Sequence, residues 1–240
     1  LSGETGHKEA LRRVDLTVAP GEFVCLLGPS GCGKTTLLNI ISGLDTDYEG
    51  TVRFLPAPET VQNQWKPTIG YVFQEARLLP WMTVRENVRL VMGERGRSAD
   101  ATRLIDDWLA RVGLKGHGDY YPGQLSIGMQ QRVAVARALI VQPDVLVMDE
   151  PFSGLDPEAV DEMFSLLTEF TKRGVPVLFS SHQLELVERL CHQIVILRKG
   201  EQIAAGTVDE LRNAGPTHHR IQAGADLGWL GRRHLAIVEA

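Results

Sequence analysis

Cysteine is scarce in this sequence, and its three residues exclude a disulfide framework and a structural zinc site. Cys25, Cys32 and Cys191 are odd in number and are not spaced as metal-binding pairs. Structural zinc sites need four cysteine or histidine ligands, usually in closely spaced pairs, and disulfide-rich domains need a denser, even set. The three thiols therefore predict free cysteines in a reducing compartment.

Long apolar runs and basic blocks are also missing. No apolar run approaches the roughly 18 residues that a membrane-spanning helix needs, and we expect no signal peptide at Leu1. Asp and Glu number 30 against 25 Lys and Arg, a net charge of −5 that argues against a nucleic-acid-binding protein. The composition, 43% apolar and 23% charged, predicts a soluble globular protein. Such a protein can still bind to a membrane protein.

What the sequence does contain is an alternation of apolar runs and helical patterns, which is typical of an α/β fold with a mainly parallel sheet. Its 240 residues suffice for one such domain with an inserted subdomain. Continuous apolar runs predict buried strands at 23–28, 145–148, 175–181 and 194–197. Shorter patterns predict strands at 14–18, 51–55 and 69–73. Helices are expected over 35–43, 84–92, 101–112 and 157–170.

The order of these elements predicts four parts of the chain. A long run of helical patterns without a strand indicates an inserted helical subdomain. The parts are 1–76, an N-terminal β subdomain with the first part of the core; 77–140, the helical subdomain; 141–206, the second part of the core; and 207–240, a C-terminal appendage.

The segment GPSGCGKT, residues 28–35, has the spacing G-x-x-x-x-G-K-[ST] of a phosphate-binding loop. It follows a buried strand and precedes a helix, a context that disfavours a chance glycine-rich turn. Glycines let backbone N–H groups approach phosphate oxygens, and the helix start adds its positive dipole end. Lys34 is expected to reach the β- and γ-phosphates, Thr35 to offer a hydroxyl to Mg²⁺, and Thr36 to help hold phosphate. The predicted nucleotide-binding residues are Gly28, Pro29, Ser30, Gly31, Cys32, Gly33, Lys34, Thr35 and Thr36.

Two acids end a buried strand in the segment VLVMDEP. Asp149 and Glu150 are expected at the carboxyl end of that strand, where open α/β sheets bind ligands. Asp149 would hold Mg²⁺, directly or through water, and Glu150 would polarise the water that attacks the γ-phosphate. Acids also end strands as turn caps, and the phosphate loop upstream is what favours the catalytic interpretation.

Together, these motifs resemble the ATP-binding subunits of ABC transporters. The match comprises GPSGCGKTT, Gln74 after IGYVF, LSIGMQQRVAVARAL from Leu125, VLVMDEP, SGLD at 153–156 and SSH ending at His182, in the family's order over about residues 10–210. The resemblance implies an ABC-type P-loop NTPase with an N-terminal antiparallel β subdomain and an inserted helical subdomain. It also implies ATP and Mg²⁺ as cofactors, and ATP hydrolysis that powers transport through membrane-spanning permease subunits. Such subunits are cytoplasmic and peripheral on the inner face of the cell membrane.

The stretch LSIGMQQR acquires a role through this resemblance. As the start of a helix it offers N–H groups and a hydroxyl to an anion. The family pairs two copies head to tail with two MgATP between them. Ser126, Gly128 and Gln130 of one copy would then close over the γ-phosphate held by the phosphate loop of the other copy.

Three more residues take roles by the same resemblance. Gln74 would sense Mg²⁺ and the attacking water, His182 would contact the γ-phosphate, and Asp156 would organise the loop that crosses the dimer seam. A neutral imidazole donor suits a position where charge grows on phosphate oxygens. The implied catalytic residues are Glu150, His182 and Gln74, and the implied metal contacts are Thr35, Gln74 and Asp149.

Two departures from the family pattern affect the expected site. The pattern L-S-G-G-Q reads L-S-I-G-M here, with Ile127 and Met129 at its third and fifth positions. The β-branched Ile127 would either hold the two copies apart or point into the helical subdomain. No Tyr, Phe or Trp precedes Phe23 to stack on adenine, so either the strand that would carry it was lost before Leu1 or His7 is a weak substitute.

The chain combines features of two kinds of transporter. QEARLLPWMTVRENV resembles nitrate, sulfonate and taurine importer ATPases, whereas LFSSHQLELVERLCHQIVILRKGEQIAAGTVDEL and the C-terminal tail resemble drug and ion exporter ATPases. A chimera and a divergent natural member both fit this mosaic, and the direction of transport stays open. The apolar cluster Leu78, Leu79, Trp81 and Met82 is expected to dock a permease helix through one or two exposed members, or to pack inside the helical subdomain.

Three other functions compete with transport. Soluble ABC-type ATPases of DNA repair or translation usually carry a long coiled-coil insertion or tandem domains, and this sequence has neither. A P-loop GTPase or small-molecule kinase is disfavoured because the sequence has no N-K-x-D motif. A catalytically weak, regulatory ATP-binding domain would result if Ile127 and the missing aromatic residue disabled turnover.

Overall fold

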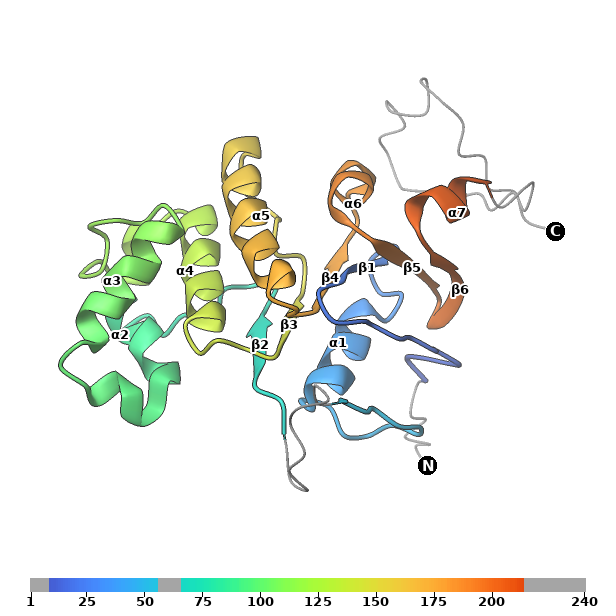
Figure 1. Cartoon of the computed structure of the whole chain (residues 1–240), viewed down its shortest axis with the longest axis horizontal. Coiled ribbons are helices and arrows are strands. Elements are labelled where there is room, and N and C mark those ends of the chain that lie inside the picture. The colour runs from blue at the N-terminus through green and yellow to red at the C-terminus, as the bar shows by residue number, and fades with distance from the viewer. Residues whose placement is uncertain (1–8, 56–65, 214–240) are drawn as a thin grey trace, which may run out of the picture.

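A computed structural model of the chain describes residues 9–55 and 66–213, and these form one six-stranded sheet flanked by helices (Figure 1). The strand order is β2-β3-β4-β1-β5-β6, and every neighbouring pair is parallel except β5 with β6. The strands are β1 Phe23–Leu27, β2 Ile69–Val72, β3 Val145–Met148, β4 Val177–Ser181, β5 Gln193–Arg198 and β6 Glu201–Gly206. The helices are α1 Lys34–Ser42, α2 Val84–Arg89, α3 Ala101–Arg111, α4 Ile127–Leu139, α5 Pro157–Lys172, α6 Leu184–Leu190 and α7 Val208–Asn213, with 3₁₀ turns η1 Leu90–Arg97 and η2 Pro122–Gln124.

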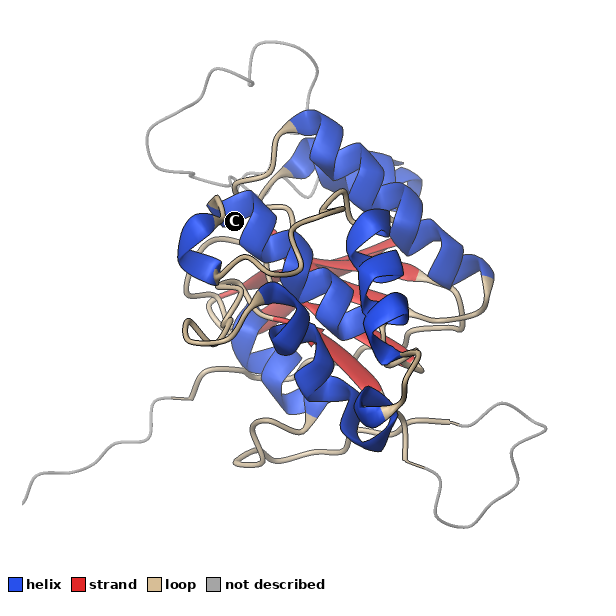
Figure 2. Cartoon of the chain, turned by 90° about the vertical axis from the view of Figure 1, so that its left-hand side faces the viewer, coloured by secondary structure: helices blue, strands red, loops and turns tan. Residues whose placement is uncertain are grey.

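The central strands are buried on both faces, as their continuous apolar runs predict. All five residues of β1 are buried, and its side chains alternate between two apolar clusters. Val24 and Leu26 pack with Leu38 of α1 on one face, whereas Cys25 and Leu27 join the larger cluster on the other. Helices therefore cover the sheet, as the side view shows (Figure 2). This confirms the predicted α/β class with a mainly parallel sheet.

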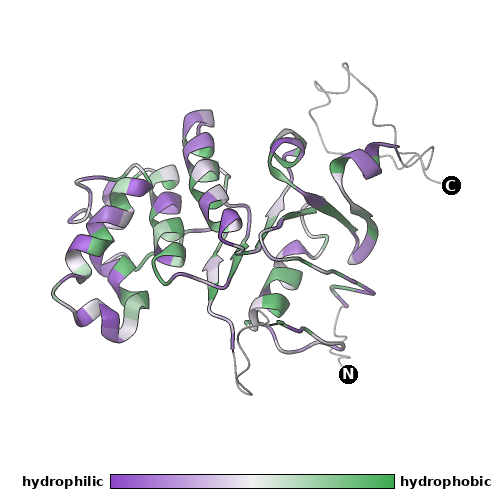
Figure 3. Cartoon of the chain, in the orientation of Figure 1, coloured by the Kyte–Doolittle hydropathy of each residue, from purple (hydrophilic) through white to green (hydrophobic). Residues whose placement is uncertain are grey.

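Between β2 and β3 the described chain forms helices and no strand, as predicted for 77–140. Thr83 caps α2 by accepting a hydrogen bond from the Glu86 N–H, and the Glu86 carboxylate accepts from the Thr83 N–H at 2.7 Å. The helix expected to reach Met92 passes into η1 at Leu90, because Gly93 in that turn has φ 53° and ψ −130°. The α3 ribbon alternates between hydrophilic and hydrophobic residues, as an amphipathic helix does (Figure 3).

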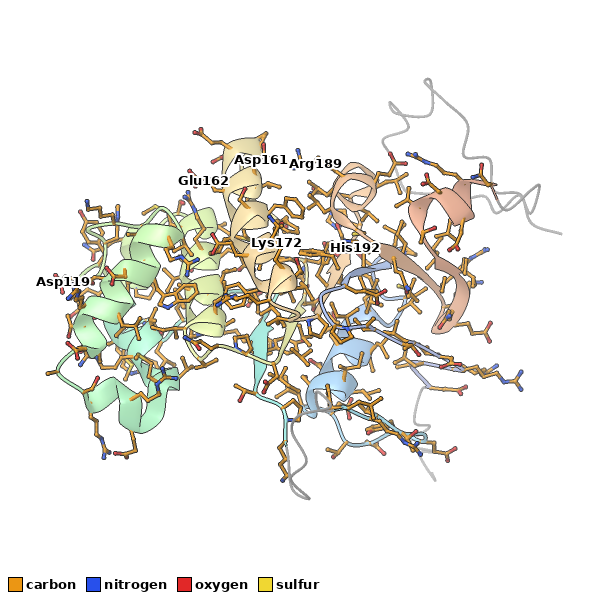
Figure 4. All side chains as sticks on the ribbon, viewed as in Figure 1. Asp119, Asp161, Glu162, Lys172, Arg189 and His192 are labelled. Carbon is orange, nitrogen blue, oxygen red and sulfur yellow. The ribbon has the colours of Figure 1, made fainter. Side chains whose placement is uncertain are left out.

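Ion pairs tie α5 to its neighbours on both sides. Arg132 of α4 lies 3.8 Å from Glu162. Arg189 of α6 lies 2.7 Å from Asp161, and both of these residues are labelled in Figure 4. Solvent screens such exposed pairs, so each contributes about 0–1 kcal/mol.

Two predicted strands, 14–18 and 51–55, do not form. The apolar residues of 14–18 are half-buried between exposed neighbours, as predicted, but no strand within 9–55 and 66–213 pairs with them. Alternating burial indicates a pleated segment, whereas a strand also needs a backbone partner. In the described residues, this part of the chain makes a single bridge, between Arg12 and Glu201. The N-terminal antiparallel β subdomain expected within 1–76 is therefore absent as paired strands from the described residues.

The end of the core holds three elements that the sequence patterns did not predict. β5 and β6 form a hairpin whose turn places Lys199 and Gly200 at φ 49° and 84°, the left-handed conformation of a two-residue hairpin turn. α6 and α7 have seven and six residues, too few for a helical period to be recognised.

Most of the predicted appendage, 214–240, lies outside the described residues, as does His7. No helix in the described ranges is long and apolar enough to cross a membrane.

Candidate functional site

The loop between β1 and α1 has the backbone of a phosphate cradle. Gly31 and Gly33 have φ values of 77° and 106°, which favour glycine. A Cβ at Gly28 would lie 2.3 Å from the Leu197 carbonyl oxygen, so no side chain fits there. No described side chain caps the first turn of α1, so its N–H groups face the loop without a side-chain acceptor. This geometry fits an anion at the helix start.

Lys34 sits inside this loop. Its side chain is only 8% exposed, and its ammonium donates to the Gly28 carbonyl oxygen at 2.8 Å and reaches Pro29 O at 3.4 Å. The same Nζ lies 3.7 Å from a carboxylate oxygen of Glu150. The buried cation is therefore surrounded by oxygen atoms, and phosphate oxygens would be equivalent partners.

Cys32 contributes to the loop differently from its neighbours. Its side chain is buried in the apolar cluster under α1, beside Leu37. The thiol therefore belongs to the core, and only the backbone of Cys32 faces the cradle. Pro29, Ser30 and Thr35 are exposed, and Thr36 is half-buried, as residues that border a nucleotide site would be.

Asp149 connects the phosphate loop to the sheet. Its side chain is buried, and one carboxylate oxygen accepts from the Thr35 hydroxyl at 2.7 Å. The other accepts from the Ser180 hydroxyl at 2.6 Å. The structure thus brings together two of the three predicted metal contacts, Thr35 and Asp149. An acid that served only as a turn cap would not need this contact. A hydroxyl and a carboxylate are the oxygen donors that Mg²⁺ prefers beside phosphate.

Described residues contain no cluster of three or more His, Cys, Asp or Glu side chains suited to a metal ion. A divalent ion held mainly by phosphate oxygens, with one or two protein oxygens, needs no such cluster. The donor set at Thr35 and Asp149 therefore fits Mg²⁺ bound together with a nucleotide.

Glu150 has a strained backbone and two polar neighbours, Lys34 and His182. Its φ of 47° lies in the left-handed region, which costs a non-glycine residue about 1–3 kcal/mol. One carboxylate oxygen lies 2.8 Å from His182 Nδ1, and the other faces Lys34. Glu150 is 11% exposed and His182 58% exposed, so this pair stands at the surface of the site, open to a substrate. The predicted Glu150 and His182 therefore meet in space.

Gln74 emerges at the same edge of the sheet. It lies two residues beyond Val72, whose carbonyl oxygen accepts from the Asp149 N–H at 2.8 Å, and its side chain is exposed. The parallel strands β2, β3 and β4 thus deliver Gln74, the acid pair and His182 to one edge.

The signature stretch forms the start of α4. Ser126 is exposed and caps the helix by accepting from the Met129 N–H at 3.2 Å. A Cβ at Gly128 would lie 3.2 Å from Leu155, so glycine permits a close approach to the SGLD loop. Gln130 is turned inward, where its amide donates to two backbone carbonyls at 3.0 and 3.3 Å. Its side chain therefore braces its own chain rather than facing outward.

Ile127 does not point into the helical subdomain, which makes that interpretation wrong. Its side chain is exposed, with 78% of the residue's surface accessible. A Cβ atom added to Gly154 would lie 3.7 Å from Cγ2 of Ile127. Ile127 thus stands at the surface beside the SGLD loop. Asp156 in that region caps α5 by accepting from the Ala159 N–H at 2.8 Å, and its implied role at a dimer seam stays a prediction.

Sequence reasoning missed two residues of α4 that hold the Gln74 segment. Gln131 is buried and donates to the Phe73 carbonyl oxygen at 3.2 Å. Arg137 donates to the carbonyl oxygens of Ala76 and Arg77 at 2.8 and 3.0 Å, and burial lowers the pKa of its guanidinium. The available signal was a glutamine at a core position of an apolar helix, three residues before Ala134. Polar side chains in such places need a specific partner.

An open cavity of about 500 Å³ lies elsewhere, at the amino end of β1. Phe23, Lys172 and His192 are among its lining residues, and the last two are visible in Figure 4. The phosphate loop follows the opposite end of β1, so this cavity is not part of the candidate site.

Comparison with known proteins gives a consistent result. A family model described as "ABC transporter" matches residues 11–153. The aliphatic sulfonates import ATP-binding protein SsuB of Bacillus subtilis is 39% identical over 81% of this chain and 75% of its own length. The sulfate/thiosulfate import ATP-binding protein CysA 2 of Chromobacterium violaceum is 37% identical over 94% of this chain, which spans 62% of that relative.

Solved structures agree with the sequence comparison. The dimeric ABC transporter cassette MJ0796 matches with a TM-score of 0.75 and 33% identity, over 85% of this chain and 94% of that one. Its dimeric post-hydrolysis state, bound to ADP and Pi, matches with a TM-score of 0.73 and 32% identity, over 83% and 90%. ATP-binding subunits of this kind are ATPases coupled to transport. By its motifs, its fold and its relatives, the chain belongs to the ABC transporter family, as an ATP-binding subunit.

Proposed function

We propose that this chain hydrolyses MgATP and thereby powers import through a membrane-embedded permease. The observation that carries the proposal is the convergence of Lys34, Glu150 and His182 beside the Thr35–Asp149 pair at one edge of the sheet. The relatives named above are import proteins, which supports import over export. A peripheral position on the cytoplasmic face of the membrane follows from that role.

Each group has a chemical task in this proposal. Lys34 and the loop N–H groups hold the phosphates, and Thr35 and Asp149 are placed to hold Mg²⁺, which would neutralise charge on the phosphate oxygens. Glu150 accepts a proton from the attacking water. His182 keeps Glu150 oriented through their 2.8 Å contact and is exposed enough to reach the γ-phosphate. Gln74, which is exposed at the same edge of the sheet, would orient the water.

The proposed active unit is a head-to-tail pair of copies. Ser126 and Gly128 start α4, in the helical part of the chain, whereas the phosphate loop precedes α1 in the core (Figure 1). Within one copy these elements occupy different parts of the molecule, so a second copy is the natural source of the signature contacts. The dimeric cassettes with a similar fold support this arrangement.

The decisive test is phosphate release by the purified chain with ATP, with and without Mg²⁺. Magnesium-dependent turnover supports the proposal. ATP binding without turnover would instead favour a regulatory ATP-binding domain. Absence of nucleotide binding would overturn the assignment of the phosphate loop.

Replacing Ile127 with glycine is expected to tighten the MgATP-dependent dimer by about tenfold, equivalent to ~1.4 kcal/mol. The exposed β-branched side chain beside Gly154 would lie in the seam, where excess volume costs about 1–3 kcal/mol. Analytical ultracentrifugation at saturating MgATP, on a hydrolysis-deficient background, measures the effect. Ile127→Ala serves as the control, since it removes the volume without the added flexibility of glycine at a helix start. Equal dimerisation of all three proteins would contradict the prediction.

Replacing Trp81 with glutamate is expected to lower transport at least about tenfold while basal ATP hydrolysis is retained. Trp81 is 70% exposed, whereas Leu78, Leu79 and Met82 are half-buried, so Trp81 is the member of the apolar cluster best placed to dock a permease. Uptake into vesicles that contain the complete transporter gives the readout. Leu44→Glu, another exposed apolar residue at 58%, is the control. Loss of ATPase activity in both variants would indicate damage to the fold instead.

A further inference from the structure

Ser180 is a polar residue in a fully buried strand. All residues of β4 are buried, and Ser180 itself has no accessible surface. A buried hydroxyl destabilises the fold unless it is hydrogen-bonded. A small apolar residue would fill the same space, so a serine at this position calls for a specific partner.

Its hydroxyl bridges the two acids of the site. Ser180 Oγ donates to Asp149 Oδ1 at 2.6 Å and accepts from the Glu150 backbone N–H at 2.9 Å. The pairing of β3 with β4 places Met148 opposite Phe179, so Asp149, which follows β3, and Ser180, the next residue of β4, are neighbours. One hydroxyl thus serves as donor to the first acid and as acceptor for the second.

Both contacts fall where the site needs rigidity. Both oxygens of the Asp149 carboxylate accept a hydrogen bond, because Thr35 donates to Oδ2 and Ser180 donates to Oδ1. Glu150 has a left-handed φ of 47°, a conformation that persists only where neighbouring groups hold it. The Ser180 contact fixes its backbone N–H, while the Glu150 side chain reaches His182 and Lys34.

We infer that Ser180 is a positioning residue, which sets the orientation of the Asp149 carboxylate and holds Glu150 in the strained conformation from which it accepts a proton from the attacking water. The inference rests on the proposed ATPase function. Ser180 touches neither nucleotide nor water in this role, and it acts only through the two acids. Partners that orient the reactive groups of a metal site typically account for about 10–100-fold in activity.

The experiment compares Ser180→Ala, Ser180→Thr and Ser42→Ala. Threonine keeps the hydroxyl and suits a strand, whereas alanine removes it. Ser42 is the control, since its hydroxyl donates to the Asn39 carbonyl oxygen at 3.0 Å in the last turn of α1, at the end of that helix opposite the phosphate loop. We expect Ser180→Ala to lower kcat by about 10–100-fold with little change in the Kd for ATP measured without Mg²⁺. Ser180→Thr should recover most of the rate, and Ser42→Ala should retain it.

A second readout does not depend on turnover. Hydrogen exchange of the Glu150 amide should be faster in Ser180→Ala than in the wild type, and slow again in Ser180→Thr. If the wild type hydrolyses ATP and Ser180→Ala does so equally well, or if Ser42→Ala loses as much activity, the inference is overturned. If the wild type does not hydrolyse ATP at all, the proposed function fails, and the exchange of the Glu150 amide alone decides whether Ser180 holds that backbone.

Discussion

Replacing Glu150 with glutamine is expected to lower kcat by about 10²–10⁴-fold while ATP binding is retained. Glutamine has nearly the same shape, so the backbone at φ 47° and the contact with His182 can persist, but an amide cannot accept a proton from water. Lys34 lies 3.7 Å from the Glu150 carboxylate and keeps its other partners in the loop, which is why binding survives. Single-turnover phosphate release, together with an ATP-binding titration, separates the two effects.

A nearby acid provides the control for this variant. Glu158 lies in the first turn of α5 and is exposed, and Glu158→Gln removes the same charge without touching the site. It should hydrolyse ATP at the wild-type rate. The Glu150→Gln protein should also accumulate as a dimer in MgATP, because the nucleotide stays intact between two copies. A variant that turned over normally would remove Glu150 from the role of base, and a strictly monomeric one would contradict the paired arrangement.

Replacing Lys34 with alanine is expected to weaken ATP binding by about 10–100-fold, the loss that corresponds to ~1.5–3 kcal/mol for hydrogen bonds to a charged group. The ammonium is buried and already surrounded by oxygen atoms of the loop and of Glu150, so nucleotide phosphates would meet it without further desolvation. Isothermal titration with ATP measures the change in Kd, and hydrolysis should fall with it.

Lys34→Arg tests whether charge alone suffices. The guanidinium is larger and planar, and the loop leaves the ammonium only 2.8 Å from the Gly28 carbonyl oxygen, so arginine should not restore binding. Lys172→Ala, at an exposed position in the last turn of α5, is the control and should bind ATP normally. Wild-type affinity in Lys34→Ala would mean that the nucleotide does not occupy this loop.

Local chemistry explains why so much of the site is predictable. The loop from Gly28 to Thr35 is one continuous segment. Its glycine and lysine spacing can therefore be recognised from the sequence without knowing the rest of the fold. The buried strands and α5 are predictable because their apolar patterns are long. The segments 14–18 and 51–55 show the limit of that reasoning, since alternating burial is present at 14–18 and strand pairing is not. The sequence allows two orientations of Ile127, and the exposure of its side chain decides between them.

The sequence by itself determined the family, the phosphate loop and the identity of the acid pair, because each depends on residues adjacent along the chain. Only the tertiary structure decided that Ser180 supports both acids, that Gln131 and Arg137 hold the backbone around Gln74, and that the Cys32 thiol is buried. These contacts join residues 30 to 61 positions apart, or depend on what packs over a side chain. Parallel pairing and helix packing set such neighbours, and neither leaves a local pattern in the sequence.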